Sequence, residues 1–337
     1  MRRIGNLYNK IISLENLQEA DKKARKGKKR SYGVRWHDRN RNANIEALHE
    51  MLRSKTYKTS KYDVFKIYEP KERDIYRLPY YPDRIVHHAI MNILEPIWVS
   101  IFTADTYSCI KGKGIHDAVK SLQRALRKNE EATRYCLKID IKKYYPSINH
   151  DILKEIIRRK IKDSDLLWLL DEIIDSVPDA QGVPIGNYLS QYLANLYLAY
   201  FDHWIKEDKN VKYYWRYADD IVVLSDNKAH LKMLLFDIGC YLEKNLKLEI
   251  KDNWQIFPVS SRGIDFLGYV FYHTHTKLRK SIKQRLARKV AKSKKNIECE
   301  KHHRSIASYW GWMKHCNSVN LEYKLFNNTR YENKFKR

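Results

Sequence analysis

The sequence has 337 residues, enough to bury a full hydrophobic core and to form two or three closely packed subdomains. Lys and Arg number 65 against 40 Asp and Glu, and the resulting net charge of +25 favours a polyanionic partner, nucleic acid rather than a membrane surface. The five cysteines show no CxxC spacing, which argues against a disulfide framework and a zinc site. The chain has neither an apolar run of about 20 residues nor a signal-peptide pattern, which argues against a membrane span and secretion. Together these features predict a cytoplasmic protein.

Residues 1–56 are predicted to form a helical extension. Apolar residues recur there at helical spacing, at Ile12, Leu14, Leu17 and Ala20 and again at Ile45, Leu48 and Leu52. The basic stretch 22–30, KKARKGKKR, separates the two groups and has almost no compensating acid. It is either a solvated loop or a contact with RNA.

The next part of the chain changes from strand-like to helical patterning. Residues 57–81 contain Val64, Ile67 and Ile75, separated by the turn-prone segment 69–72. Residues 83–102 and 117–128 carry apolar side chains at helical spacing and are predicted helices.

A pair of adjacent aspartates interrupts two runs of strand-favouring residues. Asp219 and Asp220 lie between residues 211–217 and 221–224, which are rich in aromatic and β-branched side chains. The pattern predicts a β-hairpin with two carboxylates at its turn. Because neighbouring like charges in a buried hairpin repel each other, a bound cation is the natural way to make the arrangement favourable.

A third carboxylate ends a predicted strand upstream. In residues 135–148, YCLKIDIKKYYPSI, alternating side chains lead to Asp140, and Pro146 then stops regular pairing. Three aspartates on two neighbouring strands suit hard, oxygen-seeking cations such as Mg²⁺. Two such ions roughly 3.5–4 Å apart promote phosphoryl transfer. This is the chemistry of a polymerase palm.

The C-terminal part is predicted to be helical and strongly basic. Residues 181–207 begin with a glycine- and proline-rich turn and settle into a helix, and residues 231–246 form an amphipathic helix. Beyond Lys277 a basic helix with apolar Leu278, Ile282, Leu286 and Val290 is expected, followed by an aromatic helix at 306–316. The basic face of the helix after Lys277 either contacts a template–primer backbone or is solvated. The basic side chains chosen for that contact are Lys280, Lys283 and Arg288.

The YADD tetrapeptide, the Asp140 strand with Tyr145 five residues later, and the block 181–197, QGVPIGNYLSQYLANLY, resemble reverse transcriptases. The resemblance runs from about Arg73 to about Trp312. It implies an α+β right-hand polymerase fold with fingers, an antiparallel palm sheet backed by helices, and a helical thumb. The expected division is an N-terminal extension at 1–56, fingers with the first palm-side helices at 57–134, palm with part of the fingers inserted at 135–276, and thumb at 277–337.

The resemblance also implies roles for individual residues. Two Mg²⁺ ions would be held by Asp140, Ile141, Asp219 and Asp220, with Asp140 and Asp219 as bridging ligands. The incoming dNTP would contact Lys71, Arg73, Arg84, Tyr145, Ile185, Gly186, Gln191 and Lys251. Tyr145 corresponds to the aromatic steric gate against a 2′-hydroxyl. The primer end would lie against Phe266, Leu267 and Gly268.

One position departs from most of the family. Ile185 stands before Gly186 where a glutamine is usual, and Ser190-Gln191 replaces Ser-Pro. Isoleucine cannot donate a hydrogen bond, so a source of discrimination against poorly fitting pairs is lost. The IGxxxSQ pattern resembles the reverse transcriptases of diversity-generating retroelements, which copy a retroelement RNA with errors opposite adenine. In that family Ile185 and Arg84 are the candidates for the infidelity.

That resemblance further implies the bound ligands and partners. They are template RNA, an RNA–cDNA duplex, dNTPs and a small basic oligomer, the accessory variability determinant, in a bacterial or phage-infected cytoplasm. If Ile185 only packs against the palm, fidelity is normal and the chain is a retron, group II intron-like or phage-defence enzyme. The intron interpretation is disfavoured by the lack of room after Arg337 for a maturase domain. The alternative of another class is a non-catalytic RNA-binding scaffold.

Overall fold

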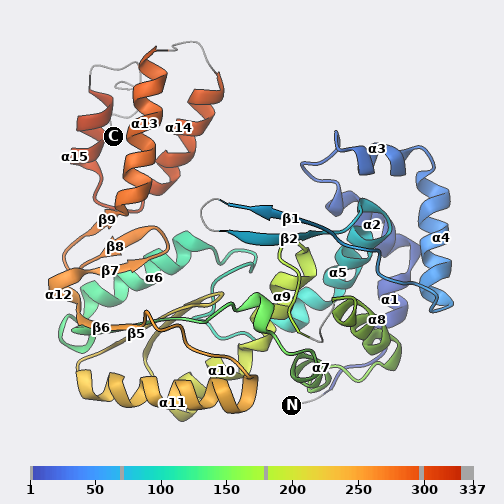
Figure 1. Cartoon of the computed structure of the whole chain (residues 1–337), viewed down its shortest axis with the longest axis horizontal. Helices are drawn as coiled ribbons and strands as arrows, with labels where there is room; N and C mark the ends of the chain where they lie inside the picture. The colour runs from blue at the N-terminus through green and yellow to red at the C-terminus, as the bar shows by residue number, and fades with distance from the viewer. Residues whose placement is uncertain (1–2, 69–71, 178–180, 296–299, 328–337) are drawn as a thin grey trace. The chain divides into compact units, whose positions relative to one another are not determined.

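The computed structural model describes residues 3–68, 72–177, 181–295 and 300–327 (Figure 1). The chain divides into two compact units. The first unit consists of Met1–Cys109, Ile141–Asn210 and Ile238–Ile250. The second consists of Ile110–Asp140, Val211–Asp237 and Lys251–Arg337. The four-part division expected from the sequence stays a prediction.

The first unit is mainly helical, and its central helix is α5. The side chains of Ile85, Val86, Ala89, Ile90 and Leu94 on this helix are buried. Both α2 and α9 pack against it. The helices are α1 (Tyr8–Ile12), α2 (Leu14–Ala24), α3 (Tyr32–Asp38), α4 (Arg41–Arg53), α5 (Ile85–Val99), α7 (His150–Arg158), α8 (Ser164–Asp175), α9 (Tyr188–Tyr197) and α10 (Ala199–His203), with π-helical turns η1 (Tyr80–Arg84) and η5 (Trp204–Asp208).

Helices α1 to α4 lie within residues 1–56, where the apolar spacing indicates helices. The side chain of Ser13 accepts a hydrogen bond from the Asn16 amide and caps α2. The basic stretch 22–30 begins inside α2 and continues as a turn. Next in this unit, β1 (Asp63–Ile67) and β2 (Arg73–Arg77) form an antiparallel hairpin within the strand-like residues 57–81, and segment 69–71 lies outside the described residues.

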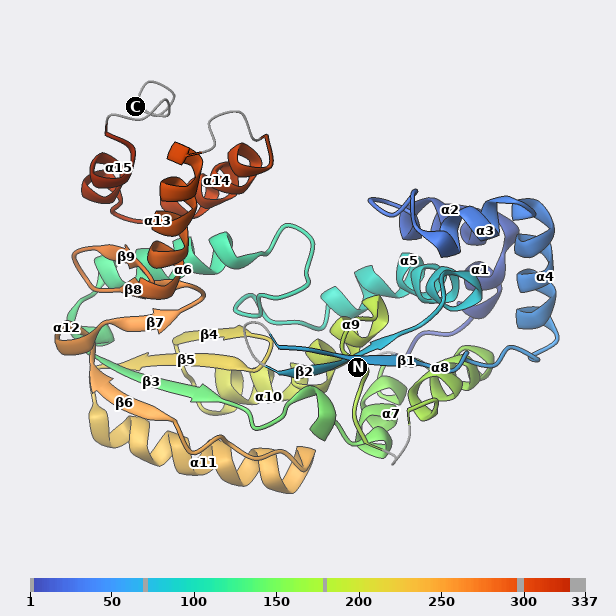
Figure 2. The same ribbon diagram turned by 45° about the horizontal axis from the view of Figure 1, so that its top comes forward.

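The second unit is organised around a four-stranded antiparallel sheet. The strands are β3 (Tyr135–Asp140), β4 (Tyr213–Tyr217), β5 (Asp220–Ser225) and β6 (Gln255–Pro258), in the order β4-β5-β3-β6 (Figure 2). Leu137, Ile139, Ile221 and Val223 are buried, and so are their neighbours Cys136, Val222 and Leu224, so both faces of the central strands are covered. Helix α6 (Ile115–Lys128) packs against β4. The predicted Asp140 strand and the predicted hairpin are therefore confirmed.

A smaller sheet and three helices complete the second unit. The strands are β7 (Ile264–Phe266), β8 (Tyr269–Phe271) and β9 (Thr276–Leu278), and the helices are α13 (Lys280–Lys295), α14 (Glu300–Met313) and α15 (Val319–Phe326). Leu278, expected on the basic helix, instead lies in β9 and pairs with Tyr269 of β8, because the helix starts at Lys280. The chain further contains α11 (Lys228–Leu246) and α12 (Val259–Arg262). No helix of the described residues is long and apolar enough to cross a membrane.

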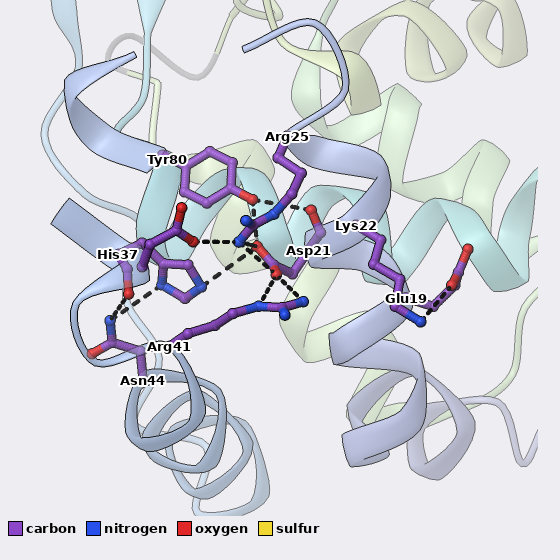
Figure 3. Close-up of polar contacts among 9 residues, drawn as sticks. Glu19, Asp21, Lys22, Arg25, His37, Arg41, Asn44 and Tyr80 are labelled. Atoms are coloured by element: carbon purple, nitrogen blue, oxygen red, sulfur yellow. Dashed lines mark hydrogen bonds and ion pairs between the residues drawn. The ribbon is translucent and has the colours of Figure 1, made fainter. Parts of the chain in front are cut away.

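A buried carboxylate joins three N-terminal helices to η1, the turn before α5 (Figure 3). Asp21 is fully buried and accepts hydrogen bonds from Arg25 at 2.9 Å, from Arg41 at 2.7 Å and from the Tyr80 hydroxyl. Nε2 of His37 lies 3.4 Å from Asp21 Oδ1. Burial alone would raise the pKa of Asp21, but the contact with His37 and the hydrogen bonds from Tyr80, Arg25 and Arg41 outweigh it and hold the pKa below its usual range.

Replacing Asp21 by Asn should lower the free energy of unfolding by about 3 kcal/mol, because buried and half-buried cations lose their counter-ion. Because the folded pKa is depressed, this stabilisation is present above the unfolded value near 4 and is lost as the pH falls below it. Urea unfolding of both proteins should show a difference that is full at pH 7 and shrinks below pH 4. Glu19→Gln is the matched control, since its ion pair with Lys22 is exposed. An equal effect of both substitutions would contradict the prediction.

Candidate active site

The β4–β5 hairpin fixes the position of two of the three aspartates. Tyr217 pairs with Asp220, so Ala218 and Asp219 form a two-residue turn. Ala218 has φ of +54°, and Asp219 is not among the residues with positive φ. A positive φ at the first turn position alone is the pattern of a type II′ turn, whose twist matches that of the flanking strands. The turn therefore places Asp219 at its end and Asp220 at the start of β5.

The strand register brings the third aspartate to the same place. Asp140 is the last residue of β3 and pairs directly with Asp220 on β5. Burial, and next the negative charge of Asp140, raise the pKa of Asp219 above its usual range. Asp140 and Asp219 are therefore close enough to repel each other. The three predicted carboxylates come together, as the sequence patterns indicate.

Lys251 provides the positive charge beside this group. Its amide donates to the Asp140 carbonyl at 2.9 Å, and its Nζ lies 3.2 Å from Asp140 Oδ2. The main-chain bond ties the segment before β6 to the end of β3. Lys251, which the resemblance places near the pyrophosphate, thus lies at the carboxylates.

The donor set suits a hard divalent cation. Among the residues that the structure describes, no three His, Cys, Asp or Glu side chains are already arranged around a point where a metal ion would fit. Mg²⁺ needs only one or two protein carboxylates, however, because water and substrate phosphates complete its octahedron. Asp140 and Asp219 supply such carboxylates, and a cation between them would relieve the repulsion that raises the Asp219 pKa.

Arg216 supports the hairpin turn and was not singled out from the sequence. Its side chain is fully buried, and Nη1 donates to the Ala218 carbonyl at 3.0 Å. A charged side chain inside a strand normally indicates an exposed face, so alternation alone could not reveal this role. Trp215, on the opposite face of β4, donates to Ser121 of α6 at 3.0 Å.

In the first unit, main-chain hydrogen bonds bring together several residues predicted to bind the nucleotide. The Val183 amide donates to the Tyr145 carbonyl at 2.9 Å, and the Tyr76 amide donates to the Ile185 carbonyl at 3.1 Å. The segment that carries Ile185 and Gly186 is therefore fixed to the Tyr145 turn at one end and to β2 at the other. Gly186 has φ of +117°, a conformation open to glycine but strained for other residues.

Arg84 lies half-buried where η1 passes into α5, and burial lowers the pKa of its guanidinium. Within the described part of the chain, no carboxylate pairs with it. One turn later, the His88 ring stacks on Tyr188 of α9 at 4.7 Å between centroids. This contact links the helix that Arg84 precedes to the helix that follows Gly186.

The other predicted side chains vary in exposure. Arg73 is exposed at the start of β2, Gln191 is half-buried on α9, and Lys71 lies outside the described residues. Phe266 is fully buried and Leu267 half-buried, in a tight turn between β7 and β8. A Cβ on Gly268 would lie 2.5 Å from Trp312. The predicted thumb contacts Lys280, Lys283 and Arg288 are all exposed on α13.

Comparisons with known proteins agree with this geometry. A family model described as reverse transcriptase (RNA-dependent DNA polymerase) matches residues 69–271. Protein YkfC of Escherichia coli is 26% identical over 60% of this chain and 65% of YkfC. The retron Ec73 reverse transcriptase of Escherichia coli is 26% identical over 62% of this chain and 68% of that protein. The group II intron-encoded protein LtrA of Lactococcus lactis is 21% identical over 57% of this chain and 43% of LtrA.

The chain thus spans less than two thirds of the length of YkfC and under half of LtrA. Among solved structures, a telomerase from Candida albicans, in complex with a fragment of telomeric RNA, matches 71% of this chain and 51% of its own with a TM-score of 0.50 and 11% identity. This likeness concerns the fold alone. The expected α+β right-hand polymerase fold is confirmed.

The turn geometry makes a prediction about residue 218. Ala218→Gly should stabilise the protein by about 1 kcal/mol, and Ala218→Val should destabilise it by about as much, because a β-branched side chain is strained at positive φ. Urea unfolding measures both changes. As the matched control, Ala47→Gly in the exposed face of α4 should destabilise the protein, by about 1 kcal/mol or less. If Ala218→Gly also destabilised the protein, the positive φ of residue 218 would be contradicted.

Proposed function

The chain belongs to the reverse transcriptase family, and on that premise we propose that it is an RNA-directed DNA polymerase. It adds deoxynucleotides to a 3′-hydroxyl on an RNA template. The observation that carries the proposal is the direct pairing of Asp140 with Asp220 across β3 and β5, with Asp219 in the adjacent turn. Holding three carboxylates this close is unfavourable in itself and serves no purpose in a scaffold that binds RNA without catalysis.

Each residue of the carboxylate group has a distinct task in this proposal. Asp140 and Asp219 hold two Mg²⁺ ions, with Ile141 as a further ligand and Asp220 as support. When bound, the two ions lower the pKa of the attacking hydroxyl and neutralise charge on the leaving pyrophosphate. Lys251, 3.2 Å from Asp140, balances the carboxylates before substrate binds.

The residues of the first unit select and hold the nucleotide. Arg73, with Lys71, binds the triphosphate, and Arg84 lies against the templating base. Arg84 has no carboxylate partner among the described residues, which leaves its guanidinium available to a ligand. Tyr145 acts as the steric gate and favours dNTPs over ribonucleotides. Support comes from the main-chain bonds that hold the Tyr145 and Ile185 segments together.

Asp219→Asn combined with Asp220→Asn should reduce primer extension on an RNA template with Mg²⁺ and dNTPs by about a thousandfold or more. Asp226→Asn, exposed just after β5, is the matched control and should extend primers at the wild-type rate. The double substitution removes the charge of the ligand Asp219 and of the supporting Asp220, whereas Asp226 has no part in the proposed metal site. Normal extension by the double variant would contradict the proposed site. If the wild-type chain bound RNA but made no cDNA under any of these conditions, the scaffold alternative would be favoured.

A second, finer function concerns fidelity. We propose that the chain makes adenine-mutagenic cDNA, as in diversity-generating retroelements, with an accessory variability determinant as partner in the bacterial cytoplasm. The supporting observation is that Ile185 has no side-chain hydrogen-bond donor. Its main-chain oxygen already accepts a hydrogen bond from the Tyr76 amide. The similarity to retron and group II intron proteins supports the ordinary-fidelity alternative.

Sequencing the cDNA from a template with all four bases separates these alternatives. Errors should concentrate opposite adenine, and Ile185→Gln should reduce them about tenfold, because one hydrogen bond to the substrate is worth about 1.4 kcal/mol. Ile185→Leu is the matched control and should leave the error spectrum as it is. Accurate cDNA from the wild-type chain would remove the mutagenic function and leave the polymerase in place.

A further inference from the structure

Helix α3 exposes a row of aromatic and basic side chains. Tyr32, Arg35 and Trp36 on α3 and Arg39, the helical cap residue directly after it, are spaced i, i+3, i+4 and i+7, so they lie on one side of this segment. Tyr32 is 78% exposed and Trp36 is 48% exposed, values unusual for large aromatic side chains. The opposite face is buried through Val34 and His37. We name Tyr32, Arg35, Trp36 and Arg39 the α3 face.

The α3 face lies in a segment with an excess of positive charge. Between Lys22 and Arg41 the sequence has ten Lys and Arg residues and a single carboxylate, Asp38. That carboxylate is already paired with Arg25 at 2.8 Å. Within the described residues, no ion pair is made by the cations Lys26, Lys28, Lys29, Arg30, Arg35 and Arg39. Such a surface attracts a polyanion and repels a basic partner, including a second copy of this chain.

The aromatic rings continue from α3 to η1. The Trp36 ring lies 6.4 Å from that of Tyr81, which in turn stacks on His37 at 5.4 Å. Tyr32 and Trp36 are separated by about 6 Å along the helix axis, so each ring can contact a different base. Exposed aromatic rings flanked by arginines are the arrangement by which proteins bind single strands, with bases on the rings and phosphates on the cations.

We propose that the α3 face binds single-stranded RNA without sequence preference. An unpaired strand fits better than a duplex, because duplex bases are stacked on each other and cannot cover a side-chain ring. The identity of the ligand rests on the proposed copying of RNA, but the binding itself requires neither dNTPs nor the three aspartates.

The buried Asp21 group makes this face rigid. His37 on α3, Arg25 after α2, Arg41 on α4 and Tyr80 on η1 all converge on Asp21 (Figure 3). Gly33 permits the close approach of α3 to η1, because a Cβ there would lie 3.0 Å from the Tyr80 Cβ. The backbone that carries the rings is thus fixed before RNA arrives, which reduces the entropy lost on binding.

The test is the affinity of the full chain for a fluorescein-labelled, unstructured 20-nucleotide RNA, measured by anisotropy without primer or dNTPs. Trp36→Ala and Tyr32→Ala should each raise Kd about fivefold or more, because a stacked base contributes at least about 1 kcal/mol. Trp36→Phe and Tyr32→Phe should retain most of the affinity, since a ring remains. Phe236→Ala on α11, where the side chain is about as exposed as that of Tyr32, is the matched control and should bind like the wild type.

Salt dependence tests the cations separately. Arg35→Gln combined with Arg39→Gln should reduce the slope of log K against log salt by about 1.4, because each single-strand phosphate that an arginine no longer neutralises lowers the slope by about 0.7. A change in folding alone would not alter this slope in proportion to the number of arginines. An unchanged slope would overturn the assignment of these arginines to phosphates.

The outcomes distinguish this proposal from the proposed polymerase. RNA binding that depends on Trp36, in a chain that makes no cDNA, would support the α3 face and remove the polymerase. Normal cDNA synthesis with identical RNA affinity for wild type, Trp36→Ala and Tyr32→Ala would do the opposite. Equal dependence on Trp36 for a blunt RNA duplex, or dependence on Trp36 only for anionic phospholipid vesicles, would overturn the choice of single-stranded RNA.

Discussion

The repulsion between carboxylates at the end of β3 is the constraint on which the rest of the candidate site depends. Antiparallel register places Asp140 opposite Asp220, and a two-residue turn leaves Asp219 no room to move away. The aspartates destabilise both the β3–β5 register and the turn, so other interactions must stabilise them. The remaining hydrogen bonds around the turn, from Arg216 to Ala218 and from Lys251 to Asp140, stabilise a geometry that the charges alone would open.

The residues of the first unit that are predicted to bind the nucleotide are held by hydrogen bonds rather than by charge. Their positions depend on main-chain hydrogen bonds between three short segments, around Tyr145, Ile185 and Tyr76. Main-chain bonds are indifferent to side-chain identity, so the side chain at position 185 can change without moving the segment. This explains how a polar residue can be exchanged for isoleucine there while the fold is kept.

The strands and their carboxylates could be predicted from sequence because their causes are local. Alternating side chains identify β3, and adjacent aspartates between two β-branched runs identify the hairpin turn. Arg216 and Asp21 could not be predicted, because their burial depends on partners far along the chain: Asp21 and Tyr80 are 59 residues apart. Leu278 was misplaced for a similar reason, since pairing with Tyr269 outweighs its helical spacing. The roles of individual residues in binding a nucleotide remain predictions.

The convergence on Asp21 has a consequence for how this protein can vary over time. A carboxylate shared by Arg25, Arg41 and Tyr80 makes each of these positions intolerant of change while the others persist. Substitutions there should therefore covary among natural variants, appearing together or not at all. By the same logic, a chimaera that joins the first 56 residues of one relative to the body of another should fold only when position 80 is inherited along with position 21.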